Sequence, residues 1–293
     1  SKDFLVSEKH QLWGGEKLYN LYQKAHTPWN WHKEIFAKCA NLGLICFSSP
    51  FDETAVKLLE DLKTPLYKVA SFEITHIPLL AEIGKTRKPV ILSTGMATEK
   101  EIYEAINTLL KNGCNKYALL KCTSTYPADP FDSNIATLSD MKKKYNCEVG
   151  ISDHTPGIGV SIAAVSFGAS IIEKHITLDR DNGAVDSFFS LEPYEFKILN
   201  IESKRAWQSI GKVKYGPTTN EKESLKHRRS IYVTEDLKKG DVINIENIKI
   251  IRPSAGLEPK YFEKIIGIRL IKDIKKNSPL DFSYIEISKD DID

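Results

Sequence analysis

The sequence has few cysteines, and no two of them are closely spaced. Five cysteines are scattered over 293 residues, and no Cys-x-x-Cys pair occurs. This pattern argues against a zinc ribbon and against a disulfide framework, because both need clustered cysteines. It fits a reducing compartment, so we expect a cytoplasmic protein.

The sequence also lacks long apolar runs and an excess of charge of either sign. No stretch of 18 apolar residues occurs, which excludes a transmembrane helix. With 41 basic and 39 acidic residues, the net charge is +2. Such a balance gives no long-range attraction for nucleic acid or for an anionic membrane, and we expect neither as a partner.

What the sequence does contain is a regular alternation of short apolar runs and longer amphipathic segments. The apolar runs are Leu44–Phe47, Leu66–Ala70, Val90–Leu92, Ala118–Cys122, Glu148–Ile151 and Ile171–Lys174. The amphipathic segments are Thr54–Leu62, Glu99–Asn112, Ile135–Lys144, Ile158–Phe167 and Pro193–Gln208. Short apolar strands that alternate with helices predict parallel βα units.

Two architectures fit parallel βα units, and the residues after the strands favour one of them. An open doubly wound sheet needs a glycine-rich first turn, which is not visible. Polar residues follow nearly every predicted strand, and a (β/α)8 barrel builds its site from all strand ends. The pattern therefore predicts a TIM barrel at 1–211, a polar linker at 212–227 and a small β-rich domain at 228–293.

Two histidines follow the last two predicted strands of the barrel. His154 stands in Ser152–Thr155, and His175 ends Glu173–His175. Neighbouring parallel strands end roughly 5 Å apart, so the two imidazoles could share Mn²⁺, Co²⁺, Fe²⁺ or Zn²⁺. The alternative is that each histidine only hydrogen-bonds within the barrel mouth.

Hydroxyl groups and two lysines form a second set at the strand ends. Its members are Ser49, Ser71, Ser93, Thr94, Ser152, Lys68 and Lys121. Hydroxyls, amides and an ammonium group that converge at a barrel mouth suit a phosphate. The alternative is ordinary turn chemistry, since serine is common at the ends of strands.

Four carboxylates are candidates for acid–base chemistry or for orienting substrate hydroxyls. They are Glu73, Asp153, Glu173 and Asp186. Alternatively, they pair structurally with Lys68 or Lys174, because carboxylates are rarely buried unless paired. Cys122 is either a nucleophile or, more commonly for such a position, a small buried residue.

Six motifs occur in the order in which the sialic acid synthase family has them. They are Ser48–Asp52, Lys68–Glu73, Leu92–Met96, Lys121–Pro127, Ser152–Thr155 and Glu173–His175. The tail resembles the antifreeze-like (SAF) domain of the same family at Arg228–Ser230, Lys239–Asp241 and Lys249–Pro253. The resemblance implies a (β/α)8 barrel followed by an SAF domain. It also implies a transferase that condenses phosphoenolpyruvate with an N-acetylated amino sugar.

The resemblance assigns roles to individual residues. The residues implied to bind phosphoenolpyruvate are Ser49, Lys68, Ser71, Ser93, Ser124 and Ser152. His154 and His175 would bind Mn²⁺ or Mg²⁺, with Co²⁺ also possible, and Tyr126 and Asp186 would face the sugar. Glu73 would add a catalytic carboxylate. Arg252 would reach an N-acyl group in the site of the neighbouring subunit, which implies a domain-exchanged homodimer.

The resemblance also implies two βα units ahead of those in this sequence, so we expect the sequence to be N-terminally incomplete. Four segments are most similar to the pseudaminate-forming branch: Leu12–Gly15, Leu18–Tyr22, His26–His32 and Val185–Pro193. That branch uses 2,4-diacetamido-2,4,6-trideoxy-L-altrose as the acceptor.

Three other functions stay open. The first is a synthase of N-acetylneuraminate or legionaminate, which would use N-acetylmannosamine or a related sugar. The second is a synthase of seven- or eight-carbon phosphorylated acids, which needs a second basic cluster that is not visible. The third is a non-catalytic sugar-binding module.

Overall fold

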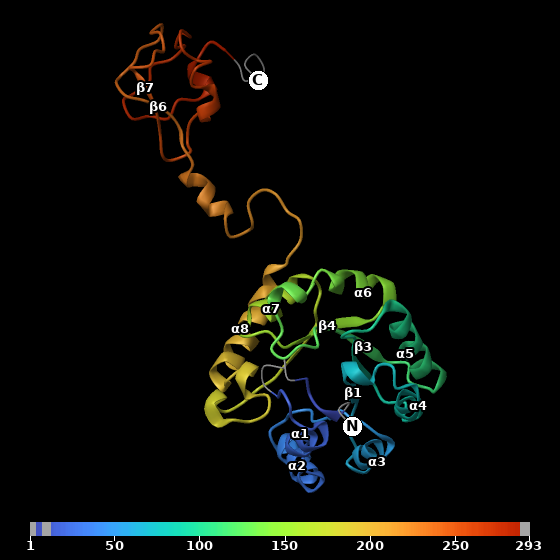
Figure 1. Cartoon of the computed structure of the whole chain (residues 1–293). Helices are drawn as coiled ribbons and strands as arrows, with labels where there is room; N and C mark the ends of the chain where they lie inside the picture. The colour runs from blue at the N-terminus through green and yellow to red at the C-terminus, as the bar shows by residue number, and fades with distance from the viewer. Residues whose placement is uncertain (1–3, 8–12, 288–293) are drawn as a thin grey trace. The chain divides into compact units, whose positions relative to one another are not determined.

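The structure, a computed structural model, describes residues 4–7 and 13–287. It divides the chain into two compact units, Ser1–Gly211 and Lys212–Asp293 (Figure 1). Leu12 of the Leu12–Gly15 motif and the outermost residues of both predicted domains lie outside the described residues. Within the described part of the chain, no helix is long and apolar enough to cross a membrane.

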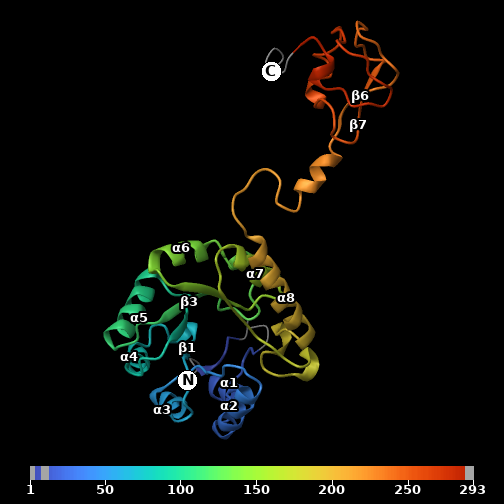
Figure 2. The same ribbon diagram turned by 180° about the vertical axis from the view of Figure 1, so that it is seen from behind.

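The first unit is built on a parallel sheet of five strands in the order β1-β2-β3-β4-β5. The strands are β1 (Tyr67–Val69), β2 (Val90–Ser93), β3 (Tyr117–Cys122), β4 (Glu148–Asp153) and β5 (Ile171–Lys174). Sequence order equals spatial order, and the sheet curves with α4 to α8 along its outer side (Figures 1 and 2). This arrangement is part of a (β/α)8 barrel, as the sequence predicts.

The first three helices precede β1, the next four connect successive strands, and the last follows β5. In chain order, the helices are α1 (Leu18–Ala25), α2 (His32–Asn41), α3 (Glu53–Asp61), α4 (Ile77–Lys85), α5 (Glu99–Lys111), α6 (Thr137–Tyr145), α7 (Gly159–Ser166) and α8 (Pro193–Ser209). The start of α5 is a capping box, in which Thr98 and Glu101 satisfy each other's backbone N–H groups. Gly113 follows its end with a φ of +105°, a conformation that glycine adopts without strain.

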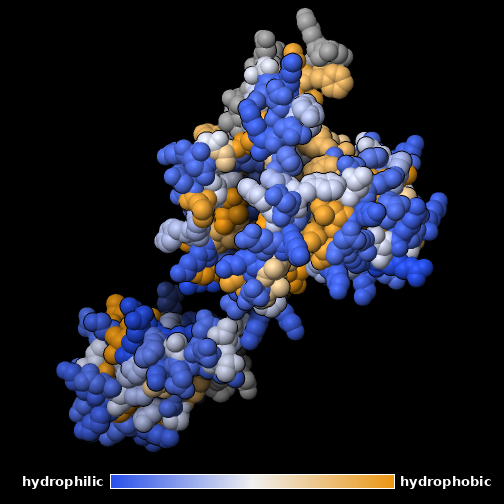
Figure 3. Space-filling view, turned by 90° about the horizontal axis from the view of Figure 1, so that it is seen from below, coloured by the Kyte–Doolittle hydropathy of each residue, from blue (hydrophilic) through white to orange (hydrophobic). Residues whose placement is uncertain are grey.

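The core of the first unit lies between the strands and the helices. Leu119 on β3, Val149 on β4 and Leu80 on α4 are each 0% exposed. Apolar side chains also remain at the surface, such as Ile45 and Phe72 at 73% and 59% exposure. Figure 3 shows such apolar areas, in orange, among the hydrophilic side chains of this unit.

The structure corrects the first of the six predicted strands. Leu44–Phe47 is not a strand, although Ser48 just after it accepts a hydrogen bond from the Lys68 amide at 3.3 Å. A strand needs a continuous ladder to a neighbour, and this single bond does not make one. Conversely, the sequence analysis did not predict α4, because Ile77–Lys85 is a short and largely apolar segment, and such a segment does not by itself distinguish a helix from a buried strand.

The second unit is β-rich and has a core of its own. Strands β6 (Ser230–Val233) and β7 (Ile248–Ile251) pair antiparallel. Three shorter segments, Asp241–Ile243, Ile268–Leu270 and Tyr284–Ile285, form no ladders and are joined only by isolated bridges. Ile231, Ile243 and Leu280 are fully buried in this core.

Gly150 marks the closest backbone approach in the parallel sheet. A Cβ at this position would lie 2.3 Å from the Ile171 carbonyl oxygen and 2.7 Å from Leu120 Cδ2. Neither neighbour can give way, because one is backbone of β5 and the other is packed in the core. Only glycine therefore lets β4 and β5 hold this register.

We expect Gly150→Ala to lower the free energy of unfolding by about 1–3 kcal/mol through overpacking. The matched control is Gly159→Ala on α7, where no atom lies within 4 Å of a built Cβ. In a helix this change is neutral or stabilising by up to about 1 kcal/mol. Urea unfolding followed by circular dichroism measures both, and equal effects would contradict the close-approach argument.

Candidate active site

The polar side chains of the site come from the carboxyl ends of the five strands. Parallel strands all end at one edge of the sheet. Ser71 follows β1, Ser93 ends β2, Ser124 follows β3, His154 follows β4 and His175 follows β5. The sheet thus collects residues that are more than 100 positions apart.

Two hydroxyl groups lie against the backbone of Gly95, and a third belongs to Ser93, which ends the strand just before it. The Gly95 N–H donates to Ser71 Oγ at 3.1 Å. A Cβ at Gly95 would lie 2.2 Å from Ser124 Oγ and 2.8 Å from Ser71 Oγ, so the space exists only because residue 95 is glycine. Ser93 Oγ is buried and has no hydrogen-bond partner among the described residues. The hydroxyls of Ser71, Ser93 and Ser124 with Gly95, here called the hydroxyl cradle, suit the oxygens of a phosphate.

Lys68 brings a buried positive charge to the same edge of the sheet. The residue is only 6% exposed, and its Nζ lies 3.5 Å from Glu173 Oε1. Ser152 Oγ donates to that same carboxylate oxygen at 2.7 Å. Glu173 therefore joins Lys68 and Ser152, two of the predicted anion-binding residues, across β1, β4 and β5.

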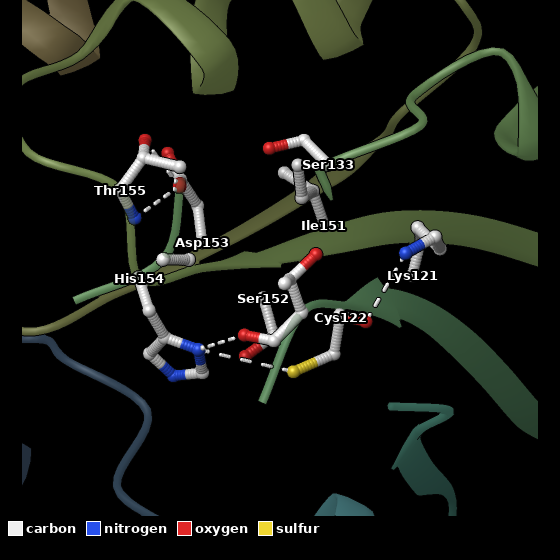
Figure 4. A pocket seen from close by; sticks show the side chains of 10 residues that line it. Lys121, Cys122, Ser133, Ile151, Ser152, Asp153, His154 and Thr155 are labelled. Atoms are coloured by element: carbon white, nitrogen blue, oxygen red, sulfur yellow. Dashed lines mark hydrogen bonds between the residues drawn. The ribbon is translucent and has the colours of Figure 1, made fainter. Parts of the chain in front are cut away.

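Two other candidates have structural hydrogen bonds instead. Thr94 Oγ1 donates to the Leu120 carbonyl at 3.1 Å, and Lys121 Nζ donates to the Cys122 carbonyl at 3.1 Å. Lys121 lines a small pocket between the ends of β3 and β4, shown in Figure 4. Burial lowers the pKa of Lys121.

The two predicted histidines stand next to each other. The ring centroids of His154 and His175 are 5.2 Å apart at an angle of 69°. His154 Nδ1 lies 2.9 Å from the Thr123 carbonyl, and His175 Nδ1 lies 3.4 Å from Asp186 Oδ2. A carbonyl can only accept, so Nδ1 of His154 carries the proton and Nε2 keeps its lone pair.

The histidine pair fits a divalent cation. Among the described residues, no three His, Cys, Asp or Glu side chains form a ready ligand set. The two imidazoles supply two nitrogen donors, and hydrogen bonds from Nδ1 hold metal-binding imidazoles in place in many proteins. This donor chemistry suits Mn²⁺ and related ions, with positions left for water and substrate.

Cys122 lies beside His154 and has an unusual environment. Its Sγ is 3.9 Å from His154 Nδ1 (Figure 4) and 3.5 Å from Ser124 Oγ. Burial acts to raise the pKa of the thiol, but these contacts and one with Ser71 outweigh it and lower the pKa to about 7. The residue is 5% exposed, so it is buried as the commoner alternative has it.

Aromatic rings form a wall against the histidines. The Tyr126 ring centroid is 4.4 Å from that of His154, and Phe189 is 5.0 Å from His175. Trp13 lies 6.1 Å from Tyr126, and its Nε1 donates to the Val185 carbonyl at 3.2 Å. Burial raises the pKa of Tyr126, so the phenol keeps its proton. Trp13 and Val185 are 172 positions apart in the sequence, so sequence reasoning did not predict their contact.

Glu73 contributes a carboxyl that is partly buried after β1. Its Oε2 has no hydrogen-bond partner among the described residues. Burial raises the pKa of Glu73, and the nearby charges of His76 and Lys68 offset only part of this effect. A carboxyl in such a place can hold a proton at a higher pH than usual.

Two predicted site residues remain. Ser49 directly follows Ser48, whose carbonyl accepts a hydrogen bond from the Lys68 amide of β1. Arg252 lies in the second unit, just after β7, with an exposed side chain. Sequence reasoning gave Gly95 no role of its own, although it lies in the Leu92–Met96 motif, two residues after β2 ends at Ser93.

Two family models match the chain over most of its length. The sequence model of the NeuB family matches residues 2–215. The chain belongs to the NeuB family. The SAF domain model matches residues 228–286, so this NeuB-family chain carries an SAF domain in its second unit.

Named relatives place the chain more narrowly. It is 40% identical to the pseudaminic acid synthase of Campylobacter jejuni, over 94% of this chain and 79% of the relative. It is 36% identical to the N,N'-diacetyllegionaminic acid synthase of the same species, over 89% and 79%. It also resembles the structure of an N-acetylneuraminic acid synthetase from Leptospira borgpetersenii, with a TM-score of 0.66 and 32% identity over 70% of this chain and 72% of the other.

Glu73→Gln tests the environment of the Glu73 carboxyl. The raised pKa means that the folded state holds the proton more tightly than the unfolded chain. The stability that this gives is present below the ordinary pKa of a glutamate and is lost as pH rises through the raised pKa. We therefore expect the variant to match the parent in acid and to become relatively more stable as pH rises.

Chemical unfolding at several pH values measures this difference. Glu104→Gln, at an exposed position on α5, is the control. A stability difference for Glu73→Gln that does not change with pH would contradict the burial argument.

Proposed function

We propose that the chain is a nonulosonic acid synthase of the pseudaminate type. In this reaction phosphoenolpyruvate condenses with 2,4-diacetamido-2,4,6-trideoxy-L-altrose to give a nine-carbon 2-keto acid and phosphate. The observation that carries the proposal is the hydroxyl cradle beside a histidine pair at the mouth of a partial barrel. The 40% identity to a named pseudaminic acid synthase supports the choice of acceptor.

The hydroxyl cradle and Lys68 would bind the phosphate end of phosphoenolpyruvate. Ser93 has a buried hydroxyl without a hydrogen-bond partner in the described part of the chain, and such a group gains a full hydrogen bond when an anion binds. Lys68 supplies a charge in a buried place, where its attraction for an anion is stronger than in water. Ser152 and Ser49 would complete the binding site.

His154 and His175 would hold the divalent cation, Mn²⁺ or Mg²⁺. When bound there, the cation supplies Lewis-acid polarisation of the sugar aldehyde. The chain's own part is to orient the two imidazoles, through Thr123 for His154 and through Asp186 for His175. Tyr126 and Asp186, which lie against this pair, would orient the sugar.

The carboxylates would stabilise the positive charge that develops on phosphoenolpyruvate. Its C3 attacks the aldehyde carbon, and positive charge grows at C2 until water adds there. Glu173, between Lys68 and Ser152, and Glu73, after β1, lie at the edge where this charge would form. The resulting tetrahedral intermediate then loses phosphate by cleavage of its C–O bond.

The alternative acceptor is the precursor of N,N'-diacetyllegionaminate or of N-acetylneuraminate. The 36% identity to a named legionaminate synthase favours this second candidate. The site described above serves either sugar, because its phosphate and histidine parts act on atoms that the acceptors share. Arg252 as an N-acyl contact from a second copy, in a domain-exchanged homodimer, stays a prediction.

Phosphate release decides between the acceptors. We expect phosphate release from phosphoenolpyruvate with Mn²⁺ and the diacetamido-trideoxy-altrose. The rate should be at least about 10-fold higher than with N-acetylmannosamine or the legionaminate precursor. A wrong acceptor that loses more than about 1.4 kcal/mol of transition-state binding is slower by at least this factor. Faster release with either of the other sugars would move the chain to that branch. Phosphate release that does not depend on any acceptor would overturn the synthase proposal.

Ser93→Ala tests the hydroxyl cradle. The hydroxyl has no hydrogen-bond partner among the residues that the structure describes, so its removal should leave thermal stability unchanged or slightly higher. A hydrogen bond to a charged ligand is worth about 1.5–3 kcal/mol, so we expect the KM for phosphoenolpyruvate to rise roughly 10- to 100-fold. The KM for the sugar should change little.

Steady-state kinetics with each substrate varied in turn measures this effect. Ser139→Ala on α6, where the hydroxyl bonds the Phe167 carbonyl on an exposed face, is the matched control. A rise in the KM for the sugar alone would refute the phosphate role of Ser93.

A further inference from the structure

A closed polar cluster lies on the side of β4 and β5 opposite to the histidine pair. Asp153 Oδ2 lies 2.9 Å from Lys174 Nζ, and both side chains are 1% exposed. The remaining acceptor positions of the carboxylate are filled. Oδ1 accepts from the Thr155 amide at 2.9 Å and from its Oγ1 at 2.7 Å, and Oδ2 accepts from Ser161 Oγ at 2.6 Å.

The cluster stands directly behind the histidines along the chain. Asp153 and Lys174 are register partners on neighbouring strands, and each is followed by one of the two histidines. Successive side chains of a strand point to opposite faces. Figure 4 shows this alternation at β4, with the His154 ring on one side and the Asp153 and Thr155 side chains on the other.

Lys174 contacts both residues that flank His154 in the sequence. Its ammonium group bonds the Asp153 carboxylate before the histidine and also donates to the Thr155 carbonyl after it. Because Lys174 itself precedes His175, one side chain of β5 fixes the backbone on either side of His154. Any slip of β4 along β5 would break both contacts at once.

Stability alone does not account for a pair of this kind. A buried ion pair gains little over apolar residues of the same shape, because desolvating two charges costs about as much as their attraction returns. The apolar alternative is open to an outer face packed under α7. A cluster with all its acceptors filled does, however, hold a single geometry, which apolar packing does not guarantee.

We propose that Asp153 and Lys174 are positioning residues that hold the His154 and His175 imidazoles at the separation needed to share one cation. The inference rests on the proposed function for the cation itself. Neither residue touches substrate or cation, since both point to the helix side of the sheet. Their effect passes through the backbone of the two strand ends.

The test is a double-mutant cycle with two readouts on the full chain. The variants are Asp153→Asn, Lys174→Met and the double substitution, each examined by Mn²⁺ titration in a calorimeter and by thermal unfolding. Each single variant leaves one buried charge without its partner, so we expect lower stability and at least 10-fold weaker Mn²⁺ binding, in the range for residues that support metal ligands.

The double variant separates positioning from stability. It has no unpaired buried charge, so its thermal stability should recover toward that of the parent. Under our proposal its Mn²⁺ affinity stays at least 10-fold low. Recovery of Mn²⁺ affinity together with stability would show a structural role only and would overturn the proposal. Lys88→Met, which removes the partly exposed Lys88–Glu60 pair at 2.5 Å, should leave Mn²⁺ binding unchanged.

A measurement without metal keeps this test apart from the proposed function. Histidine-selective ¹H–¹⁵N spectra of the metal-free chain report which ring nitrogen of His154 carries the proton, with His154→Gln for assignment. We expect a fixed Nδ1–H form in the parent and a mixture of tautomers in the double variant. An unchanged spectrum would overturn the proposal. If the parent binds no Mn²⁺, the cation assignment fails, while the spectra still decide the positioning role.

Discussion

The carboxyl ends of parallel strands must finish along one edge, and in this chain that geometric constraint assembles the whole site. Register pairs link all five strands. Val69 pairs with Leu92, Leu92 with Leu119, Leu120 with Gly150, and Ser152 with Glu173. Each strand therefore delivers its polar end to the same edge of the sheet. Gly150 has no side chain, which lets β4 and β5 approach closely enough to hold this register.

The site has two chemically different halves that meet at Glu173. One half, toward β1 to β3, offers hydroxyls and the ammonium group of Lys68. The other half, toward β4 and β5, offers imidazoles, aromatic rings and a carboxylate. Glu173 contacts Lys68 and Ser152 and stands two residues before His175. An anion bound in the first half and a polarised carbonyl in the second would thus be neighbours, as a condensation between them requires.

Much of this arrangement could be predicted from the sequence, and the failures have physical reasons. Strands and helices with clear periodicity or caps, such as the segments around Val90 and Thr98, were predicted close to their observed bounds. Leu44–Phe47 has the composition of a strand, but a strand also needs a partner, which composition does not reveal. The pairing of the two histidines followed from strand order alone.

Contacts between residues that lie far apart in the sequence could not be predicted. The contact of Trp13 with Tyr126, the approach of the Ser71 and Ser124 hydroxyls to Gly95 and the lowered pKa of Cys122 all depend on side-chain geometry. Asp153 was a candidate for acid–base chemistry from its place after a strand. Its side chain faces the helices instead, because it is one residue out of phase with Ser152 and His154.

The burial of Lys174 has a consequence for the reactivity of the chain. Lysine amines react with acylating reagents only when solvent and reagent can reach them, and most lysines lie at the surface of a protein. The side chain of Lys174 is 1% exposed and is held by a carboxylate and a carbonyl. Covalent labelling of this amine would therefore proceed only when the β4–β5 edge opens. The labelling rate thus measures local unfolding at that edge.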